Sequence, residues 1–338
     1  MAKSPEEQLS VVAIIPLYNG ARYIAEAIES VLAQSVRPDE IIVVNDGSDD
    51  DGPAIAEKFE PRGVTVLHKE NGGQGSARNL GVANSTSDVI CFLDQDDLWY
   101  PNHVELLLKA YTHALASHQG RELGWAYGNL DEIDENGMFV SERFLDRLGS
   151  THPKTSLEDC LAQDMFVLPG ASLVSRTAFD AVGGFDEMFR GYEDDDLFLR
   201  IFRLGYRNVY LDKPITQWRI YGGSTSYTPT MARSRVRYFH KLVDEFARDD
   251  EELGRDYVQD TIAPRFVFKA AAEYRRALRR SDFRVMDAAV QEMLEVSEYL
   301  SPYRRARVRT VLPLMRRHGL ARAAMFFPLE NRIQRYLS

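Results

Sequence analysis

Cysteine is scarce in this chain of 338 residues, and long hydrophobic runs are missing. The two cysteines, Cys91 and Cys160, exclude a disulfide framework and a zinc site built from several cysteines. No apolar stretch approaches the roughly 18–20 residues that cross a bilayer. The opening segment, Met-Ala-Lys-Ser-Pro-Glu-Glu, lacks the apolar core of a signal peptide. We therefore expect a cytoplasmic protein.

Basic side chains are in short supply over most of the chain and concentrate at its end. The formal net charge is −10 at pH 7. From Ser301 onward, nine arginines stand against one acidic residue, Glu330, so this segment carries +8 and the preceding 300 residues carry −18. A general nucleic-acid binder needs a basic surface for phosphates. We therefore expect no nucleic-acid partner.

Short apolar runs alternate with helical patterns in the first part of the chain. The runs have strand length and β-branched content, whereas residues 21–34 place apolar side chains at spacings of three and four, as in a helix with one buried face. This alternation indicates an α/β protein with a mostly parallel sheet, whose ligands bind beyond the carboxyl ends of the strands. The expected strands are Val11–Ile15, Ile41–Val44, Val64–Leu67 and Val89–Leu93, and the expected helices are Ala21–Gln34, Pro53–Phe59, Gly75–Ala83 and Pro101–Ser117.

After about residue 228 the strand patterns stop, and only amphipathic helical patterns follow. The length of the chain also favours two domains, at roughly 100–200 residues each. We expect a first domain at residues 1–230 and an all-helical domain at 231–338. The helices expected there are Ala232–Ala247, Val258–Leu278, Asp282–Leu300 and Pro302–Arg317.

Polar and glycine-rich segments follow the expected strands. The first two strands end in Pro-Leu-Tyr-Asn (16–19) and Asn-Asp-Gly-Ser (45–48). Asp46 can accept hydrogen bonds from a base or ribose, but the second segment is also ordinary turn chemistry. Residues 71–81 are glycine-rich and precede a helix, as phosphate-cradling loops do. Arg78 replaces the third glycine of a dinucleotide fingerprint, and no Gly-Lys-Ser/Thr is present, so neither of those motifs applies. The glycines also fit a purely structural role, the close passage of backbone.

Three carboxylates follow the fourth strand, at Asp94, Asp96 and Asp97. They repel one another unless a cation or solvent relieves the repulsion. An Asp-x-Asp pair can share one hard divalent ion, whose vacant positions suit phosphate oxygens. A solvated acidic loop that caps the next helix is the alternative, and the apolar residues on both sides of the cluster weigh against it.

These segments together resemble glycosyltransferase family 2, the GT-A-type nucleotide-sugar transferases. The resemblance rests on P-L-Y-N, V-V-N-D-G-S, N-G-G…A-R-N-L-G, F-L-D-Q-D-D-L-W and G-Y-E-D-D-D-L-F-L-R, and it covers roughly residues 10–226. It implies a GT-A fold, Rossmann-like with a mostly parallel sheet and flanking helices, followed here by a C-terminal all-helical region. It also implies that Asp94 and Asp96, with Asp97 as a further candidate, place Mn²⁺ or Mg²⁺ on the donor diphosphate. The residues implied to bind the nucleotide-sugar are Pro16, Tyr18, Asn19, Asp46, Arg78, Asn79, Asp94, Gln95 and Arg219.

A second acidic run, at residues 193–196, supplies the candidate catalytic residues. The resemblance places the Glu–Asp pair of the family on Glu193 and Asp194 and makes Asp194 the base that deprotonates the acceptor hydroxyl. Crowding by like charge would raise the pKa of this base toward a useful range. The apolar helical face that follows allows a second role, because acidic residues at a helix start cap it and favour its dipole. Glu193 and Asp196 stay open as weaker candidates for the base.

Two departures from family patterns bear on the metal and on the product. Relatives often have a histidine two residues after the arginine at Arg219, available to the metal or diphosphate, and this chain has Tyr221 instead. The departure leaves a third protein ligand to the metal open. The chain also lacks the Q-x-x-R-W motif and the membrane spans of processive synthases, so we expect one sugar to be transferred per encounter.

The sequence therefore predicts an inverting, metal-dependent glycosyltransferase that uses a nucleotide-sugar and a hydroxyl acceptor. The resemblance alone implies inversion, and its commonest donor is a UDP-sugar. We expect the acceptor to be a glycan or lipid-linked glycan of cell-envelope polysaccharide biosynthesis. The alternatives are a non-catalytic carbohydrate- or partner-binding protein on the same scaffold and a sugar nucleotidyltransferase. The glycine-rich, arginine-containing opening loop of the latter is replaced here by Pro-Leu-Tyr-Asn.

The arginine-rich end, residues 301–338, alternates basic and apolar side chains. Such a segment can lie on anionic lipid, where each basic side chain contributes ~1 kcal/mol. Peripheral contact with the inner face of the cytoplasmic membrane is one expectation. The other is packing within the protein, on its acidic body or in a homo-oligomer interface.

Overall fold

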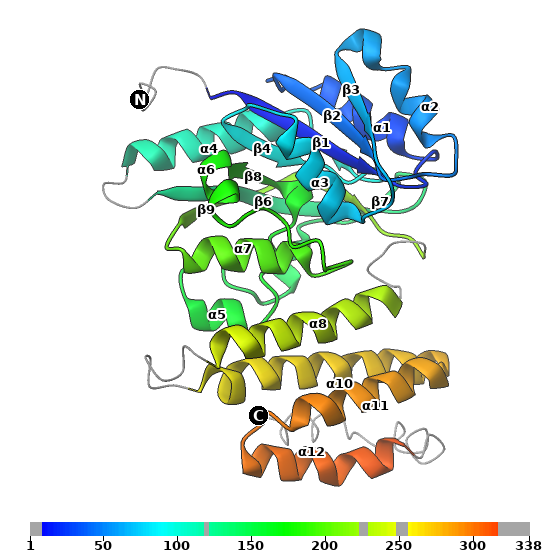
Figure 1. The fold of residues 1–338 in the computed structure, drawn as a ribbon, viewed down its shortest axis with the longest axis vertical. Coiled ribbons are helices and arrows are strands. Elements are labelled where there is room, and N and C mark those ends of the chain that lie inside the picture. The colour runs from blue at the N-terminus through cyan, green and yellow to red at the C-terminus, as the bar shows by residue number, and fades with distance from the viewer. Residues whose placement is uncertain (1–8, 118–121, 223–228, 248–255, 317–338) are drawn as a thin grey trace. The chain divides into compact units, whose positions relative to one another are not determined.

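The structure, a computed structural model, describes residues 9–117, 122–222, 229–247 and 256–316. Its contacts divide the chain into two compact units (Figure 1). The first comprises Met1–Leu157 and Met165–Ser234, and the second comprises Glu158–Asp164 and Arg235–Ser338. The segment 158–164 therefore belongs to the second unit by its contacts, although the first unit flanks it in the sequence.

Four parallel strands form the half of the sheet that comes first in the chain, in the order β3-β2-β1-β4. All residues of β1 are buried, as in a central strand covered on both faces. Every strand and helix predicted for residues 11–117 is present, with ends displaced by no more than three residues. The elements are β1 (Val11–Leu17), α1 (Ile24–Leu32), β2 (Glu40–Asn45), α2 (Gly52–Glu57), η1 (Glu60–Arg62), β3 (Val64–His68), α3 (Gln74–Ala83) and β4 (Val89–Phe92).

The second half of the sheet is mixed. β8 pairs antiparallel with both β4 and β6, and β6 pairs parallel with β9. The full order is β3-β2-β1-β4-β8-β6-β9-β5, with β7 attached to β6. The parallel pairing predicted from the sequence thus holds for the first four strands. The further elements are β5 (Leu98–Trp99), α4 (His103–Ser117), β6 (Leu123–Ile133), β7 (Phe139–Ser141), η2 (Phe144–Arg147), η3 (Pro169–Ala171), β8 (Ser172–Ser175), α6 (Arg176–Ala181), α7 (Glu193–Arg203) and β9 (Arg207–Arg219).

The strand order places a crevice at the carboxyl ends of β1 and β4. The chain leaves β1 for β2 on one side and returns to β4 on the other, which makes this point a topological switch. Alternate residues of β1, from Val11 to Leu17, share a core cluster with α1 and α4. Ile14 points to the opposite face and meets α3 at Gly81, where a Cβ atom would lie 2.6 Å from its Cγ2 atom. Both faces of the sheet are therefore closely covered.

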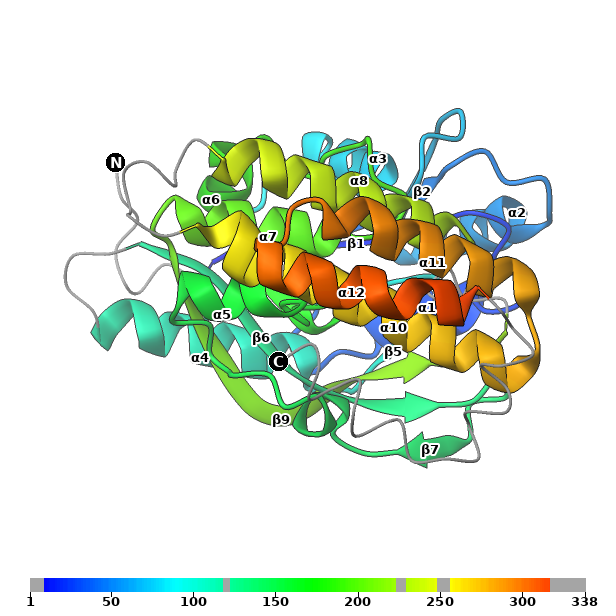
Figure 2. The same cartoon turned by 90° about the horizontal axis from the view of Figure 1, so that it is seen from below.

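The described part of the second unit is helical (Figure 2). Helices α10, α11 and α12 lie alongside one another in that order. Buried ion pairs connect segments of this unit. Arg235 pairs with Glu292 at 2.6 Å, and Arg265 pairs with Asp164 at 2.7 Å. Glu273 also pairs with Arg235, and Lys269 also pairs with Asp164, so Arg235 and Asp164 each have two partners of opposite charge. The elements are α5 (Leu157–Ala162), α8 (Pro229–Phe246), the π-helical turn η5 (Val258–Ile262), α10 (Ala263–Arg280), α11 (Phe283–Ser297) and α12 (Pro302–Met315).

The basic helix α12 makes contacts within the second unit. Val308 and Leu312 are buried, and Arg305 and Arg309 both pair with Glu298. The rest of the predicted basic tail, residues 317–338, lies outside the described residues. In the described part of the chain, no helix has the length and apolar character needed to cross a membrane. The predicted contact of the tail with a membrane surface stays a prediction.

Replacing Gly81 by alanine is expected to destabilise the protein, although alanine is the better helix former. Propensity alone would stabilise α3 by ~1 kcal/mol. The added methyl group would lie 2.6 Å from Cγ2 of Ile14, however, and such overpacking costs ~1–3 kcal/mol. Urea unfolding followed by circular dichroism measures the difference. Gly222→Ala is the control, because no described atom lies within 4 Å of its added methyl group. A Gly81→Ala protein as stable as the wild type would contradict the close packing.

Candidate active site

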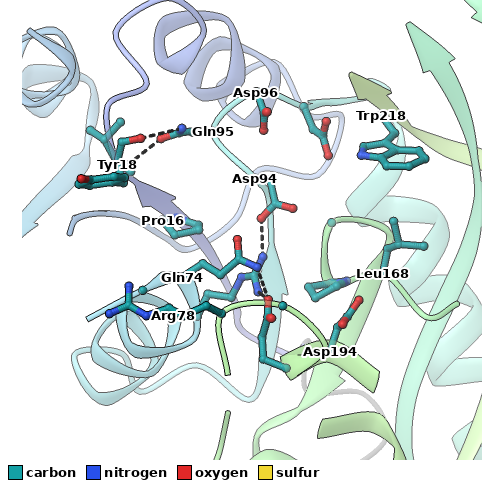
Figure 3. Close-up of a pocket in the computed structure, with 18 of the residues that line it drawn as sticks. Pro16, Tyr18, Gln74, Arg78, Asp94, Gln95, Asp96, Leu168, Asp194 and Trp218 are labelled. Carbon is teal, nitrogen blue, oxygen red and sulfur yellow. Dashed lines mark hydrogen bonds and ion pairs between the residues drawn. The ribbon is translucent and has the colours of Figure 1, made fainter. Parts of the chain in front are cut away.

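The strand ends converge on a cavity of about 610 Å³ in the first unit (Figure 3). Its walls come from the loops after β1, β2, β3 and β4, from the start of α7 and from β9. A concave site of this size suits a small-molecule ligand. The residues predicted from the sequence that line it are Pro16, Tyr18, Asn19, Asp46, Arg78, Asp94, Gln95, Asp96, Asp97, Glu193 and Asp194.

Gln95 ties the loop after β4 to the loop after β1. Its amide oxygen accepts a hydrogen bond from the backbone N–H of Tyr18 (2.7 Å), and its amide nitrogen donates to the Tyr18 carbonyl (3.0 Å). A Cβ atom at Gly20 would overlap Oε1 of Gln95, so a side chain there would displace the Gln95 amide. Asn19 adopts a left-handed backbone with φ 50°. Tyr18 lines the cavity and is 47% exposed, so its ring can stack on a planar ligand.

Asp46 is buried and orders the glycine-rich loop before α3. Its Oδ1 atom accepts hydrogen bonds from Nζ of Lys69 (2.7 Å) and the N–H of Gly72 (2.8 Å). Its Oδ2 atom accepts from the N–H of Gly73 (2.6 Å), a residue with φ 91°. The structure therefore gives Asp46 a loop-ordering role in the cavity wall. Its contact with a nucleoside stays a prediction.

The three carboxylates after β4 lie in different surroundings. Asp94 faces the cavity with 36% of its side chain exposed. Asp96 accepts a hydrogen bond from the Tyr221 hydroxyl (2.9 Å), and burial together with the charge of Asp94 raises the pKa of Asp96 to about 6. Asp97 accepts from the backbone N–H of Arg219 (2.8 Å). Burial and the two neighbouring carboxylates raise the pKa of Asp97 well above its usual range. The repulsion expected from the sequence is therefore present.

Asp94 and Asp96 fit a hard divalent cation as part of its ligand shell. Among the described residues, no group of three or more His, Cys, Asp or Glu side chains is placed to hold a metal ion. Mg²⁺ is commonly bound through one or two carboxylates plus substrate phosphates. Asp94 and Asp96 would supply the carboxylates of such a site. Tyr221, at the position of the family histidine, contacts Asp96 instead of adding a nitrogen ligand. The donor set thus suits a cation shared with a diphosphate.

Arg78 joins the two acidic groups of the cavity. Its side chain is buried, and it pairs with Asp94 on one side and with Glu193 at 3.0 Å on the other. Gln74 also donates a hydrogen bond to Glu193. Desolvation disfavours the charged guanidinium, but the adjacent carboxylates outweigh it and raise the pKa of Arg78. Arg78 therefore stays charged and holds the loop after β4 against the start of α7.

The acidic run at the start of α7 divides between the cavity and the fold. Glu193 and Asp194 line the cavity. Asp195 accepts a hydrogen bond from a backbone N–H (2.9 Å), and Asp196 pairs with Arg200 at 2.7 Å. Desolvation and the charges of Glu193 and Asp195 raise the pKa of Asp194 well above its usual range. Asp194 thus has the increased proton affinity that suits a general base near neutral pH.

Asn79 and Arg219 do not line the cavity and lie behind the residues that do. Asn79 exchanges two hydrogen bonds of 2.9 Å with the backbone of Phe185, which steadies the segment before α7. Arg219 pairs with Glu26 at 2.9 Å and donates to the carbonyl of Asp96 at 2.7 Å. Both side chains therefore support the loops of the site. Their contact with a nucleotide-sugar stays a prediction.

Sequence reasoning gave no role to several residues that line the cavity. Arg190 donates a hydrogen bond to Asn71 (2.8 Å) and adds a cation to the wall. Tyr192 precedes α7 with φ 67°, a backbone conformation that is costly for a bulky residue. Arg190 lies three residues before the Glu193–Asp194 pair, and this short spacing could have indicated that it lines the same cavity. No sequence pattern indicated the left-handed backbone of Tyr192.

Comparisons with known proteins found similar sequences and similar folds. Residues 12–124 match the model of glycosyl transferase family 2, and residues 163–227 match the model of the N-terminal domain of galactosyltransferase. An uncharacterized glycosyltransferase of Rickettsia bellii is 38% identical over 206 residues, which cover 60% of this chain and 28% of that protein. The chain spans less than two thirds of the length of the first curated relatives that it matches.

Two solved structures share the fold. S. aureus TarS 1–349, in complex with UDP-GlcNAc, has a TM-score of 0.56 and 18% identity, covering 96% of this chain and 92% of that chain. The mannosyltransferase PcManGT from Pyrobaculum calidifontis, in complex with GDP-Man and Mn²⁺, has a TM-score of 0.52 and 17% identity, covering 99% and 87%. The predicted GT-A-type fold with a helical C-terminal region is confirmed.

Arg78→Gln is expected to destabilise the protein by ~3–5 kcal/mol, because Glu193 would remain buried without its cation. The double variant Arg78→Gln/Glu193→Gln should recover much of this loss, since it also removes the charge of Glu193. Urea unfolding of the wild type, both single variants and the double variant gives the coupling energy.

The exposed pair Arg62–Glu29 supplies the control for this cycle. Its side chains are 48% and 52% exposed, and the same cycle there should give ~0–1 kcal/mol. Strictly additive losses at Arg78 and Glu193 would show that the bridge does not act as a unit.

Proposed function

We propose that this chain, whose residues 12–124 match the model of glycosyl transferase family 2, is an inverting, metal-dependent glycosyltransferase. It moves one sugar from a nucleotide-sugar to a hydroxyl acceptor, with residues 1–230 as the catalytic domain and 231–338 as a helical domain. The supporting observation is that one cavity contains both the Asp94–Asp96 pair and Asp194 (Figure 3). Direct transfer requires the leaving-group site and the base to be held together around the substrates.

On the donor side, the loop after β1 offers the nucleoside a surface made by Pro16, Tyr18 and Asn19. The ordered glycine-rich loop beside Asp46 completes that wall. Asp94 and Asp96 would hold Mn²⁺ or Mg²⁺ together with the diphosphate. When bound, such a cation offsets the negative charge that develops on the departing diphosphate.

On the acceptor side, Asp194 takes the proton of the attacking hydroxyl. The hydroxyl oxygen forms its bond to the anomeric carbon as the bond from that carbon to the diphosphate breaks. One displacement of this kind inverts the anomeric configuration. Glu193, held by Arg78 and Gln74, fixes the start of α7 and with it the position of Asp194.

We base the proposed donor and acceptor classes on the similar proteins and on the chemistry of the transfer. We propose a UDP-sugar as donor, as in the TarS complex, and a GDP-sugar is the alternative suggested by the PcManGT complex. We propose a glycan or lipid-linked glycan of cell-envelope polysaccharide biosynthesis as acceptor, modified in the cytoplasm or at the inner face of its membrane. A peripheral membrane contact or a homo-oligomer contact through residues 301–338 is part of the same proposal.

Calorimetric titration with UDP, GDP and dTDP, each with Mn²⁺ and again with EDTA, tests the donor side. We expect one nucleotide to bind with Mn²⁺ and to bind much more weakly with EDTA. Asp94→Ala or Asp96→Ala should weaken the Mn²⁺-dependent binding by ~10–100-fold or more, as losses around metal sites do. Glu57→Ala removes an exposed carboxylate that is not part of the cavity lining and serves as the control. Unchanged EDTA-sensitive binding in both aspartate variants would contradict the metal assignment.

Asp194→Asn is expected to bind the nucleotide as the wild type does and to lose transfer by ~10²–10⁴-fold, the usual contribution of a general base. The wild-type pKa of Asp194 is raised in the folded state, so its ionisation opposes folding above the unfolded pKa of ~3.9. The asparagine variant should therefore melt at the wild-type temperature or higher near neutral pH. Near-normal turnover would refute the role of Asp194 as base.

The pH dependence of kcat/KM tests the same residue. Below the raised pKa the base is protonated, so kcat/KM should fall ~tenfold per pH unit and reach a plateau above it. We expect the midpoint of this acidic limb well above ~3.9. The pH profile of the residual activity of Asp194→Asn should lack this acidic limb. A midpoint in the ordinary aspartate range, or the same limb in the variant, would contradict the assignment.

A further inference from the structure

Three aromatic side chains from distant parts of the chain lie together beside the cavity. Trp218 of β9 belongs to the cavity lining. The ring of Phe144, from η2, lies 5.0 Å from that of Trp218 at an angle of 67°. The ring of Phe166 lies 6.5 Å from that of Phe144 at 74°. All three residues are partly exposed, and we call them the aromatic cluster.

Trp218 differs from a tryptophan that serves only the core. Trp99 is 3% exposed, and its indole N–H donates to the carbonyl of Gly170 (3.0 Å). Trp218 is partly exposed, and none of the described residues accepts a hydrogen bond from its indole N–H. Trp218 therefore presents the cavity with both an apolar face and an unused hydrogen-bond donor.

Phe166 adds a second observation. Its backbone has φ 50°, in the left-handed region that a bulky side chain adopts at a cost of ~1–3 kcal/mol. Such strain persists where the surrounding structure holds a side chain in a required place. Arg147 lies over the ring of Phe144 at 5.5 Å and borders the cluster with a polar group.

The cluster lies on the acceptor side of the site. In Figure 3, Tyr18 and Trp218 stand on opposite sides of the Asp94–Asp96 segment, and Leu168 and Asp194 stand on the side of Trp218. Tyr18 belongs to the proposed nucleoside wall. The acceptor hydroxyl must reach the base, so the acceptor has to occupy the wall that Asp194 shares with Trp218.

A pyranose ring matches this wall in its chemistry. One face of such a ring presents mainly C–H groups and packs on an aromatic face, while its hydroxyls point outward to hydrogen-bonding groups. The free indole N–H of Trp218 can donate to one of these hydroxyls. Open-chain polyols carry the same hydroxyls without a rigid apolar face.

We propose that the aromatic cluster is an acceptor subsite in which Trp218 stacks on a pyranose ring of the acceptor glycan, with Phe144 and Phe166 supporting it. The inference rests on the proposed function and narrows the acceptor to a pyranosyl compound. Trp218 is then a residue that determines acceptor affinity, and it takes no part in donor binding.

Tryptophan fluorescence of the intact protein tests the subsite directly. The chain has three tryptophans, and Trp99 and Trp125 are 3% and 0% exposed, so acrylamide quenching reports mainly on Trp218. The probes are methyl α- and β-pyranosides of glucose, galactose, mannose and N-acetylglucosamine, with mannitol as the open-chain control. Each is titrated with and without the nucleotide that binds in the presence of Mn²⁺. We expect saturable protection from quenching by at least one pyranoside and none by mannitol.

Variants separate stacking from packing. Trp218→Leu keeps an apolar side chain but removes the aromatic face, and it should weaken the binding of the protective pyranoside by about tenfold or more, as truncation of an anchor residue does. Trp218→Phe keeps a face and should bind more tightly than Trp218→Leu; pyranoside binding to these variants is measured by calorimetry. Both variants should retain the wild-type nucleotide affinity, because the proposal gives Trp218 no part in donor binding. Tyr303→Ala, at a 70% exposed ring on α12, is the control.

The outcomes are distinct. Protection of Trp218 by no pyranoside of the panel, or equal pyranoside affinity in Trp218→Leu and the wild type, overturns the proposal even if nucleotide binding is normal. Weaker nucleotide binding in Trp218→Phe and Trp218→Leu alike also overturns it, because Trp218 would then serve the donor. Protection without binding of any nucleotide would keep the carbohydrate subsite and refute the transferase.

Discussion

Arg78 carries its charge in a place that water does not reach, between a carboxylate that faces the cavity and a carboxylate at the start of α7. Asp94 and Glu193 keep it charged, and it in turn makes their proximity tolerable. Removal of Arg78 would leave the buried Glu193 without its cation, whereas removal of either carboxylate would leave Arg78 paired with the other one. The loop after β4 and the start of α7, which are about a hundred residues apart in the sequence, are thereby held as one site.

The rest of the cavity depends on the same balance of charge. Asp96, Asp97 and Asp194 are crowded by like charges, and their pKa values are raised. Hydrogen bonds from Tyr221 and from the backbone of Arg219 relieve part of this crowding. The remaining repulsion is the property that suits the site to a divalent cation on one side and a proton acceptor on the other. A site of this kind costs stability, and the closely packed sheet beneath it offsets that cost.

The cavity wall opposite the loop after β1 has a different composition. It is aromatic, and its members come from β9, from η2 and from the segment that re-enters the first unit at Met165. The chain passes through the second unit at residues 158–164 between Phe144 and Phe166. The proposed donor wall thus uses loops at the ends of parallel strands, whereas the proposed acceptor wall uses β9 and irregular segments of the mixed half of the sheet.

The sequence by itself determined the parallel strands, the helices between them and the helical C-terminal region, because each depends on local periodicity and on the burial of one face. Most of the site residues that it predicted line the cavity, because the ends of parallel strands meet at one edge of a sheet. Only the tertiary structure decided that Asp46 orders a loop, that Asn79 and Arg219 lie behind the lining, and that Arg190, Tyr192 and Trp218 line the cavity. Hydrogen bonds and ring contacts between segments distant in the sequence set these roles, and the periodicity of one chain does not encode which distant groups meet.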